Sequence, residues 1–377
     1  MKDLINELTI ALNIHMPDKE QKLWFFRTNG GEYYKDYCIN GFIALGWDKI
    51  DRDLITDSNY SFDQKKEKIS ELYPDELRPG LILGQMNSFY NKMNIGDIIL
   101  IPSQGGKQIC IGVLQDLTNN DIKHLSLEEE YARCTYTHKR KVNWIKKVDS
   151  WQDVYLFKEL RAQQTISDIT DCAHLVYRNL YSAYVSKQSI HLTLQKKTNS
   201  DYSLKNNLEF SSAIISISEN IAEMYNEKNI TDFIKIKTAV GSPGFIEIIM
   251  PYVPIAPIVI GIIINAVLGK IKTENKATSS GIIGIIDIVN KIINDHHLRK
   301  KTDAEINLLN AQACKTMAEA KKITAETRLL QKDLDLPNQS QISNNIDSVE
   351  ANCNKLRAAT TSAGLVFSEM PENEKVG

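Results

Sequence analysis

The feature that most constrains this chain is an uncharged, apolar stretch at residues 248–268, IIMPYVPIAPIVIGIIINAVL. A stretch of this length could cross a bilayer as one helix. Its prolines at positions 251, 254 and 257 oppose such a helix, because proline lacks a backbone N–H and clashes with the preceding turn. A helix from Pro257 to Lys270 would have about 13 residues and cover roughly 20 Å, less than the roughly 30 Å of the hydrocarbon core.

A second apolar piece, GIIGIIDIVNKII, follows at residues 281–293 and contains Asp287. The two pieces together have three interpretations. They are buried helices of a protein core or an oligomer interface, a membrane span or inserted hairpin, or a shallow helix at the membrane surface. The sequence does not decide among these three.

Composition and charge narrow the class of protein. Apolar residues make up 42% and charged residues 24%, which is typical of globular proteins and excludes wholesale disorder and fibrous repeats. The net charge of -2 provides no global positive field, so nucleic-acid binding would need a local basic patch. The 6 cysteines include no C-x-x-C pair, which excludes the common zinc frameworks. We therefore expect a reducing, cytoplasmic location, and the apolar stretch leaves association with the inner membrane open.

The pattern of apolar residues predicts an α+β protein with a small, curved, barrel-like sheet in its N-terminal half. Short strands such as FIALGWD, DIILIPS and ICIGVLQ alternate with glycine turns there. Further on, FIKIK, the turn GSPG and FIEII predict a β-hairpin after an amphipathic helix. The chain then divides into an N-terminal helix (1–20), a recognition domain (21–150), a helical connector (151–200), a helix–hairpin module (201–250), an apolar membrane or oligomerisation segment (251–297), a long helix (298–334) and a disordered tail (335–377).

The sequence contains no recognisable catalytic constellation. Asp48, Asp51 and Asp53 could bind a metal, but no nuclease-like lysine spacing accompanies them, and a solvated loop explains them. His296 and His297 are adjacent, so on a helix their side chains point about 100° apart. Phosphate-binding loops and nucleophile elbows are also missing from the sequence. We therefore expect no metal and no cofactor, and whether the protein is an enzyme stays open.

The aromatic residues indicate a binding site in the N-terminal half. All 4 tryptophans lie between residues 24 and 151, and a small barrel needs several such rings as core. The remaining rings could wall a pocket in which a flat base stacks, with polar side chains reading its edge. The candidate ligand-binding or base-binding residues are Trp24, Arg27, Tyr34, Trp47, Ser103 and Gln104.

A basic run lies on the last expected strand of the same domain. It supplies the local positive patch that the near-neutral net charge requires for contact with a nucleic-acid backbone. An edge strand kept basic against aggregation is the alternative interpretation. The residues concerned are His138, Lys139, Arg140, Lys141 and Lys146.

Residues 22–170 combine the opening aromatic strand KLWFFRT, Gly46-Trp47, Gly96-Asp97 before an apolar strand, and the closing basic strand HKRKVNWIKKV. In these features the range resembles the PUA-like domains related to the EVE domain, which occur in bacterial restriction and phage-defence proteins. The resemblance implies a small curved sheet with a pocket, often for a modified base extruded from nucleic acid. Residues 208–247 are similar to an uncharacterised helix–hairpin module that precedes apolar segments in bacterial defence and signalling proteins.

These observations lead to an expected function as an antiphage sensor and effector. The PUA-like domain would recognise modified or foreign nucleic acid, or a nucleotide. The apolar C-terminal half would form a homo-oligomer, with the inner membrane as a candidate target. The alternative is a soluble nucleic-acid-binding specificity subunit that docks a separate effector enzyme, such as a restriction nuclease or a helicase.

Overall fold

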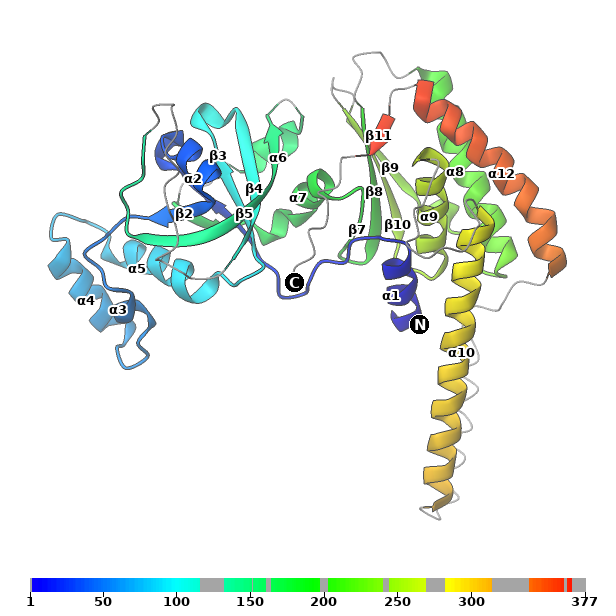
Figure 1. The fold of residues 1–377 in the computed structure, drawn as a ribbon, viewed down its shortest axis with the longest axis horizontal. Helices are drawn as coiled ribbons and strands as arrows, with labels where there is room; N and C mark the ends of the chain where they lie inside the picture. The colour runs from blue at the N-terminus through cyan, green and yellow to red at the C-terminus, as the bar shows by residue number, and fades with distance from the viewer. Residues whose placement is uncertain are drawn as a thin grey trace. The chain divides into compact units, whose positions relative to one another are not determined.

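The chain forms two compact units in a computed structural model (Figure 1). Among the described residues, one unit lies within residues 17–180, and the other within residues 1–16 and 181–369. The structure describes residues 2–115, 132–150, 152–160, 164–196, 203–239, 244–268, 282–313, 339–362 and 365–367.

The unit at residues 17–180 is built on a curled, half-barrel sheet of six strands in the order β2-β5-β4-β3-β1-β6 (Figure 1). β1 and β3 run parallel, and the other neighbours are antiparallel. A register shift between Ile111 and Gly112 interrupts the pairing of β4 with the long strand β5, and such bulges increase the local bend. The strands are β1 (Leu23–Phe26), β2 (Phe42–Leu45), β3 (Ile98–Pro102), β4 (Gln108–Leu114), β5 (His138–Asp149) and β6 (Ile166–Asp168).

Short helices connect these strands and complete the core. The helix α4 begins at a capping box, in which the Ser61 and Gln64 side chains each accept a backbone N–H of the other residue. α2 ends at Gly41, whose φ of 67° suits a residue without a side chain. The helices are α2 (Tyr34–Asn40), α3 (Arg52–Thr56), α4 (Phe62–Leu72), α5 (Pro79–Asn87), α6 (Val154–Glu159) and α7 (Ala173–Leu180).

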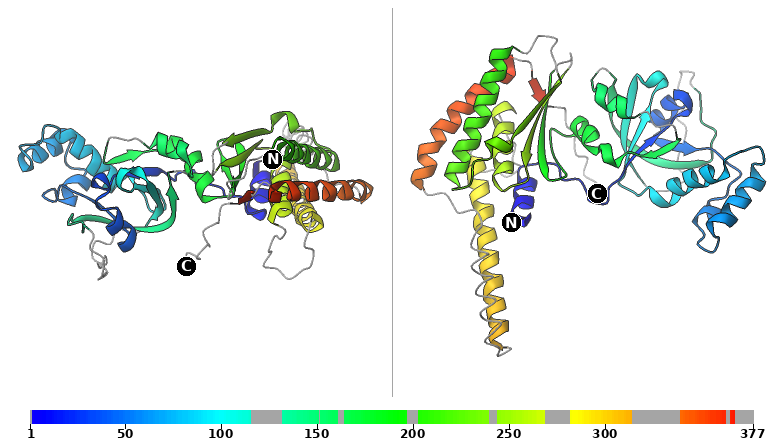
Figure 2. Two further views of the ribbon diagram at one scale, coloured as in Figure 1. Left: turned by 90° about the horizontal axis from the view of Figure 1, so that it is seen from above. Right: turned by 180° about the vertical axis from the view of Figure 1, so that it is seen from behind.

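The second unit has a sheet of five strands with its helices on one face (Figure 2). Alternate residues of a strand point to the same side, so Ile190, Leu192 and Leu194 of β8 share one face of the sheet. This face meets the helices, because the three side chains belong to the same buried cluster as the helix residues. The strands are β7 (Ala183–Ser186), β8 (Ser189–Lys196), β9 (Lys235–Ala239), β10 (Phe245–Pro251) and β11 (Leu365–Phe367). The helices are α1 (Lys2–Ala11), α8 (Leu204–Met224), α9 (Ile255–Leu268), α10 (Ile282–Ala313) and α12 (Gln339–Ser362).

The apolar stretch at residues 248–268 lies in the core of this second unit. Pro251 ends β10, and Pro257 lies in the first turn of α9, where its missing N–H is tolerated. Ile258, Ile260 and Ile262 are fully buried in a core shared with α1, α8, α10 and α12. The structure therefore selects the buried-core interpretation for α9. Within the described ranges, no helix has both the length and the apolar character needed to cross a membrane.

Several element predictions differ from the structure. The segment at 151–200 is not a helical connector throughout, because β6, β7 and β8 lie within it. Part of the tail at 335–377 is ordered as α12, whose Val349, Leu356 and Ala359 are buried in the core. The predicted long helix at 298–334 continues an earlier helix, since α10 already begins at Ile282, and residues 314–334 lie outside the described part of the chain.

Candidate functional site

The unit at residues 17–180 contains a pocket of about 400 Å³ beside the ends of β1 and β2. Arg27, which follows β1, and Gly46 and Trp47, which follow β2, belong to its lining. The pocket is also bordered by a short 3-10 turn, η1 (Asn29–Gly31), and by one residue of α2. Its lining consists of Arg27, Asn29, Gly30, Tyr37, Ala44, Leu45, Gly46, Trp47, Tyr136 and Thr165.

Trp47 lies in this lining with an uncommon backbone conformation. Its φ is 67°, in the left-handed region that bulky residues rarely adopt. Two donors hold its carbonyl oxygen: the backbone N–H of Ile50 at 2.9 Å and Nε2 of His138 at 3.2 Å. Strained residues that are fixed in this way are concentrated at functional sites.

The hydrogen bonds of His138 determine which of its ring nitrogens carries the proton. A carbonyl oxygen only accepts, so Nε2 must donate to Trp47, and Nδ1 of a neutral ring then accepts from the Tyr90 hydroxyl at 2.5 Å. His138 is buried between these two partners. It therefore positions the Trp47 turn from behind the pocket.

Arg27 places a cation at the pocket. It follows β1 directly, and its backbone N–H donates to the Thr165 carbonyl at 2.8 Å, which brings both lining residues together. Arg27 is exposed to solvent. Guanidinium groups offer several donors in one plane and suit phosphates and base edges.

Tyrosines form the rest of the aromatic wall. The Tyr136 ring meets the Tyr33 ring edge-on, with centroids 5.4 Å apart, and lies against Gly46. The Tyr37 hydroxyl donates to the Ala44 carbonyl at 2.9 Å. Burial raises the pKa of Tyr37 far above its ordinary value, so this ring stays uncharged. The pocket thus combines flat, neutral surfaces with a single arginine among its lining residues.

Four of the predicted ligand residues lie outside this lining. Trp24 is 2% exposed, and its Nε1 donates to the buried Asp97 carboxylate at 2.8 Å. Tyr34 donates to Gln108 at 2.9 Å, and the Ser103 hydroxyl accepts the Gln108 backbone N–H at 2.9 Å. The fourth, Gln104, is exposed and belongs to the turn η3 (Gln104–Gly106). Its backbone packs so closely on Gly31 of η1 that a side chain at position 31 would not fit.

The predicted basic strand divides into buried and outward positions. Arg140 is 1% exposed and donates to the carbonyls of Phe89 and Met93, at 2.7 and 2.9 Å. Lys146 donates to the Asn179 carbonyl at 2.6 Å. Together with the buried His138, these residues have structural partners, whereas Lys141 is exposed and Lys139 lies over the Phe42 ring. β5 pairs with β2 over residues 138–141 and with β4 over residues 142–149, so each of these basic residues has a strand partner on one side.

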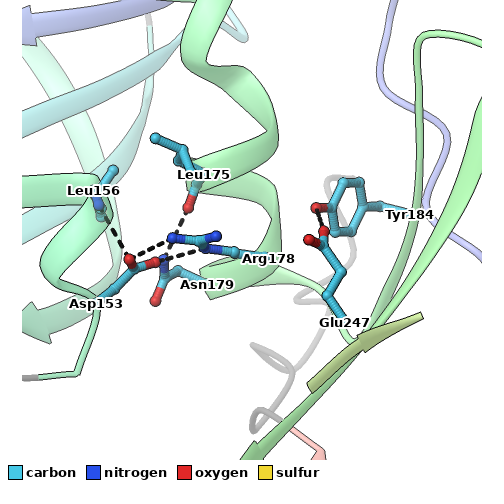
Figure 3. A network of polar contacts seen from close by, with 7 residues as sticks. All are labelled: Asp153, Leu156, Leu175, Arg178, Asn179, Tyr184 and Glu247. Atoms are coloured by element: carbon cyan, nitrogen blue, oxygen red, sulfur yellow. Dashed lines mark hydrogen bonds and ion pairs between the residues drawn. The ribbon is translucent and has the colours of Figure 1, made fainter. Parts of the chain in front are cut away.

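A buried ion pair that sequence reasoning missed supports the same unit. Both oxygens of the Asp153 carboxylate accept from the Arg178 guanidinium, at 2.7 and 2.5 Å (Figure 3). Asp153 also caps α6 through the Leu156 N–H and accepts from Asn179. The pair joins α6 to α7, and no local motif announces it, because its members are 25 residues apart.

The aspartates Asp48 and Asp51, whose sequence pattern was interpreted as a solvated loop, have local roles. Asp51 accepts the backbone N–H of Asp53 and caps α3, and Asp48 accepts both the N–H and the hydroxyl of Thr137. Among the residues that the structure describes, no group of three histidine, cysteine or acidic side chains could hold a metal.

Residues 24–170 match a family model described as a domain of unknown function (DUF8426). This range falls within the unit at residues 17–180 and contains every residue of the pocket lining. No curated protein and no solved structure matches the chain.

Proposed function

We propose that the unit at residues 17–180 is a recognition module that binds a planar base, in a nucleotide or in nucleic acid. The observation that carries this proposal is the pocket in which Trp47, Tyr136 and Arg27 meet. Its volume of about 400 Å³ falls in the range of small-ligand sites. Aromatic faces favour stacking of a flat ring, and the arginine favours a phosphate or an acceptor on the base edge.

The wider role that we propose is recognition of foreign or modified nucleic acid in antiphage defence. The resemblance to PUA-like domains related to the EVE domain supports this role. The free cysteines of the described chain suit a reducing cytoplasm. As the effector step we propose self-association of the second unit, with the inner membrane as a candidate target; the surface involved would not be α9, whose side chains are buried in the core.

The ligand proposal is tested by calorimetric titration of the full chain with nucleoside 5′-monophosphates and short single-stranded oligonucleotides. We expect Trp47→Ala and Arg27→Ala each to weaken the best-bound probe. Loss of one stacking contact costs about 1–3 kcal/mol, which is roughly a 5- to 150-fold change in Kd. Gln104→Ala is the matched control, because Gln104 is exposed near the pocket but does not line it.

Thermal unfolding of each variant separates loss of binding from loss of fold. Folded Trp47→Ala and Arg27→Ala variants that bind as tightly as the unsubstituted chain would show that the pocket is not the site. If both variants are unfolded, Trp47 and Arg27 are needed for the fold of the domain, and the proposal that they bind the ligand fails.

A further inference from the structure

One turn of π-helix, η2 (Ser88–Lys92), follows α5 in the unit at residues 17–180. The Met93 N–H donates to the Ser88 carbonyl at 3.0 Å, which is the i+5 pairing of a π-helix. The buried Arg140 guanidinium donates to the carbonyls of Phe89 and Met93, at 2.7 and 2.9 Å. Single π-helical turns are frequent at functional sites, and Arg140 of β5 fixes this one in place.

This turn places Tyr90 against His138. The Tyr90 hydroxyl lies 2.5 Å from Nδ1 of His138, and the two rings meet edge-on with centroids 5.7 Å apart. The Arg52 guanidinium lies over the Tyr90 ring, 5.7 Å from its centroid. Burial raises the pKa of Tyr90 to about 12, so at neutral pH the hydroxyl keeps its proton and donates it to Nδ1. Tyr90 itself does not line the pocket.

The turn that carries Trp47 depends on hydrogen bonds from the start of β5. The left-handed backbone of Trp47, with its φ of 67°, persists only where its surroundings hold it. His138 donates from Nε2 to the Trp47 carbonyl at 3.2 Å. The next residue, Asp48, accepts both the N–H and the hydroxyl of Thr137, each at 2.7 Å. Two consecutive residues therefore clamp two consecutive residues of the turn.

We propose that Tyr90 is a positioning residue of the pocket. Its hydroxyl orients the His138 ring so that Nε2 meets the Trp47 carbonyl, which keeps Trp47 in the conformation that lines the pocket. Without this hydroxyl, Nδ1 is a buried acceptor that lacks its donor, and the ring loses the partner that fixes its orientation. A smaller fraction of the chain then has the pocket preformed. The effect on ligand affinity rests on the proposed function, whereas the effect on the Trp47 turn does not.

The first measurement needs no ligand. Hydrogen–deuterium exchange of the full chain, resolved at residues 47–51, reports on the Ile50 N–H, which donates to the Trp47 carbonyl. In Tyr90→Phe we expect this amide to exchange about 2- to 10-fold faster, which is the effect of losing one hydrogen bond. Tyr155→Phe is the matched control, because it removes the hydroxyl of a tyrosine that is 56% exposed on α6 of the same unit. It should leave the exchange at Ile50 unchanged.

Two replacements of His138 separate positioning from a purely structural role. The amide nitrogen of glutamine can take the place of Nε2, whereas that of asparagine reaches only the place of Nδ1. We therefore expect His138→Gln to keep the Ile50 amide protected and His138→Asn to lose that protection. Equal exchange in these two folded variants would overturn the proposal, as would unchanged exchange in Tyr90→Phe. The two sets of variants test the proposal independently.

Titration with nucleoside 5′-monophosphates then connects the Trp47 turn to binding. We expect Kd to rise about 2- to 10-fold in Tyr90→Phe and to stay unchanged in Tyr155→Phe. If exchange changes as expected but Trp47→Ala leaves Kd unchanged, the proposed function fails and the positioning of Trp47 by Tyr90 stands. If Trp47→Ala weakens binding but Tyr90→Phe alters neither exchange nor Kd, the positioning role fails and the proposed function stands.

Discussion

Two tryptophans show how single residues acquire different roles from similar surroundings in sequence. Trp24 and Trp47 each stand at a strand of the same sheet, and both were candidates for stacking. The Asp97 carboxylate accepts the Trp24 Nε1 and fixes that ring in the core. Trp47 instead has a left-handed backbone held by His138, a residue 91 positions away. Such distant partners cannot be read from local sequence. The sequence therefore identified both tryptophans as candidates but did not show that Trp24 belongs to the core and Trp47 to the pocket lining.

His15 provides a prediction about pH at the residue scale. It stacks on Tyr181 with ring centroids 3.5 Å apart, and burial lowers its pKa from 6.5 to about 4. Above pH 6.5 the ring is neutral in both the folded and the unfolded chain. Between pH 6.5 and about 4 mainly the unfolded chain gains the proton, so the free energy of unfolding falls as the pH falls.

We expect this proton uptake to cost the protein about 1–2 kcal/mol by pH 4.5, after allowance for the partial exposure of the ring. His15→Phe keeps a flat ring and removes the titration, so the variant should lose less stability over the same interval. Urea unfolding of both proteins at pH 7.5 and pH 4.5 measures the difference. An equal loss in the two proteins would show that His15 does not cause the acid sensitivity.

At the scale of elements, the prolines and the apolar composition of residues 248–268 predict where a helix can form, but not whether α9 is buried in protein or in a membrane. The prolines correctly excluded one long helix across residues 248–268, and the structure has a strand followed by a helix of 14 residues. The sequence left its surroundings open, because a buried helix and a membrane helix share the same apolar composition. The antiparallel pairing of β9 with β10 was predicted correctly, since alternation is a local signal, whereas the predicted turn GSPG falls largely on residues 240–243, outside the described part of the chain.

A matched pair of isoleucines tests the burial of α9. Ile262→Ala removes a fully buried side chain and should lower the free energy of unfolding by about 2–5 kcal/mol. Ile215→Ala makes the same change on α8, where the side chain is 44% exposed, and should cost less than about 1 kcal/mol. Urea unfolding curves give both values. Similar effects at the two positions would contradict the assignment of α9 to the core.

For the whole molecule, the sequence predicted the α+β fold class with a curved N-terminal sheet, but not how the second unit is assembled. That unit takes α1 from the start of the chain, where Leu4, Leu8 and Leu12 join the core of residues 181–369. Tyr252 donates to Asn6 at 2.5 Å, and Arg299 pairs with Glu7 at 2.6 Å. These contacts join residues more than 240 positions apart. Division of the chain by local sequence patterns therefore separated α1 from the elements of residues 181–369 with which it packs.

The central claim is that the pocket beside Trp47 holds a planar base. A crystal structure of the full chain with the best-bound nucleotide tests it most directly. We predict a base ring in contact with Trp47 and Tyr136, with Arg27 at its phosphate or its edge. A nucleotide bound elsewhere on the protein, with this pocket empty, would contradict the claim.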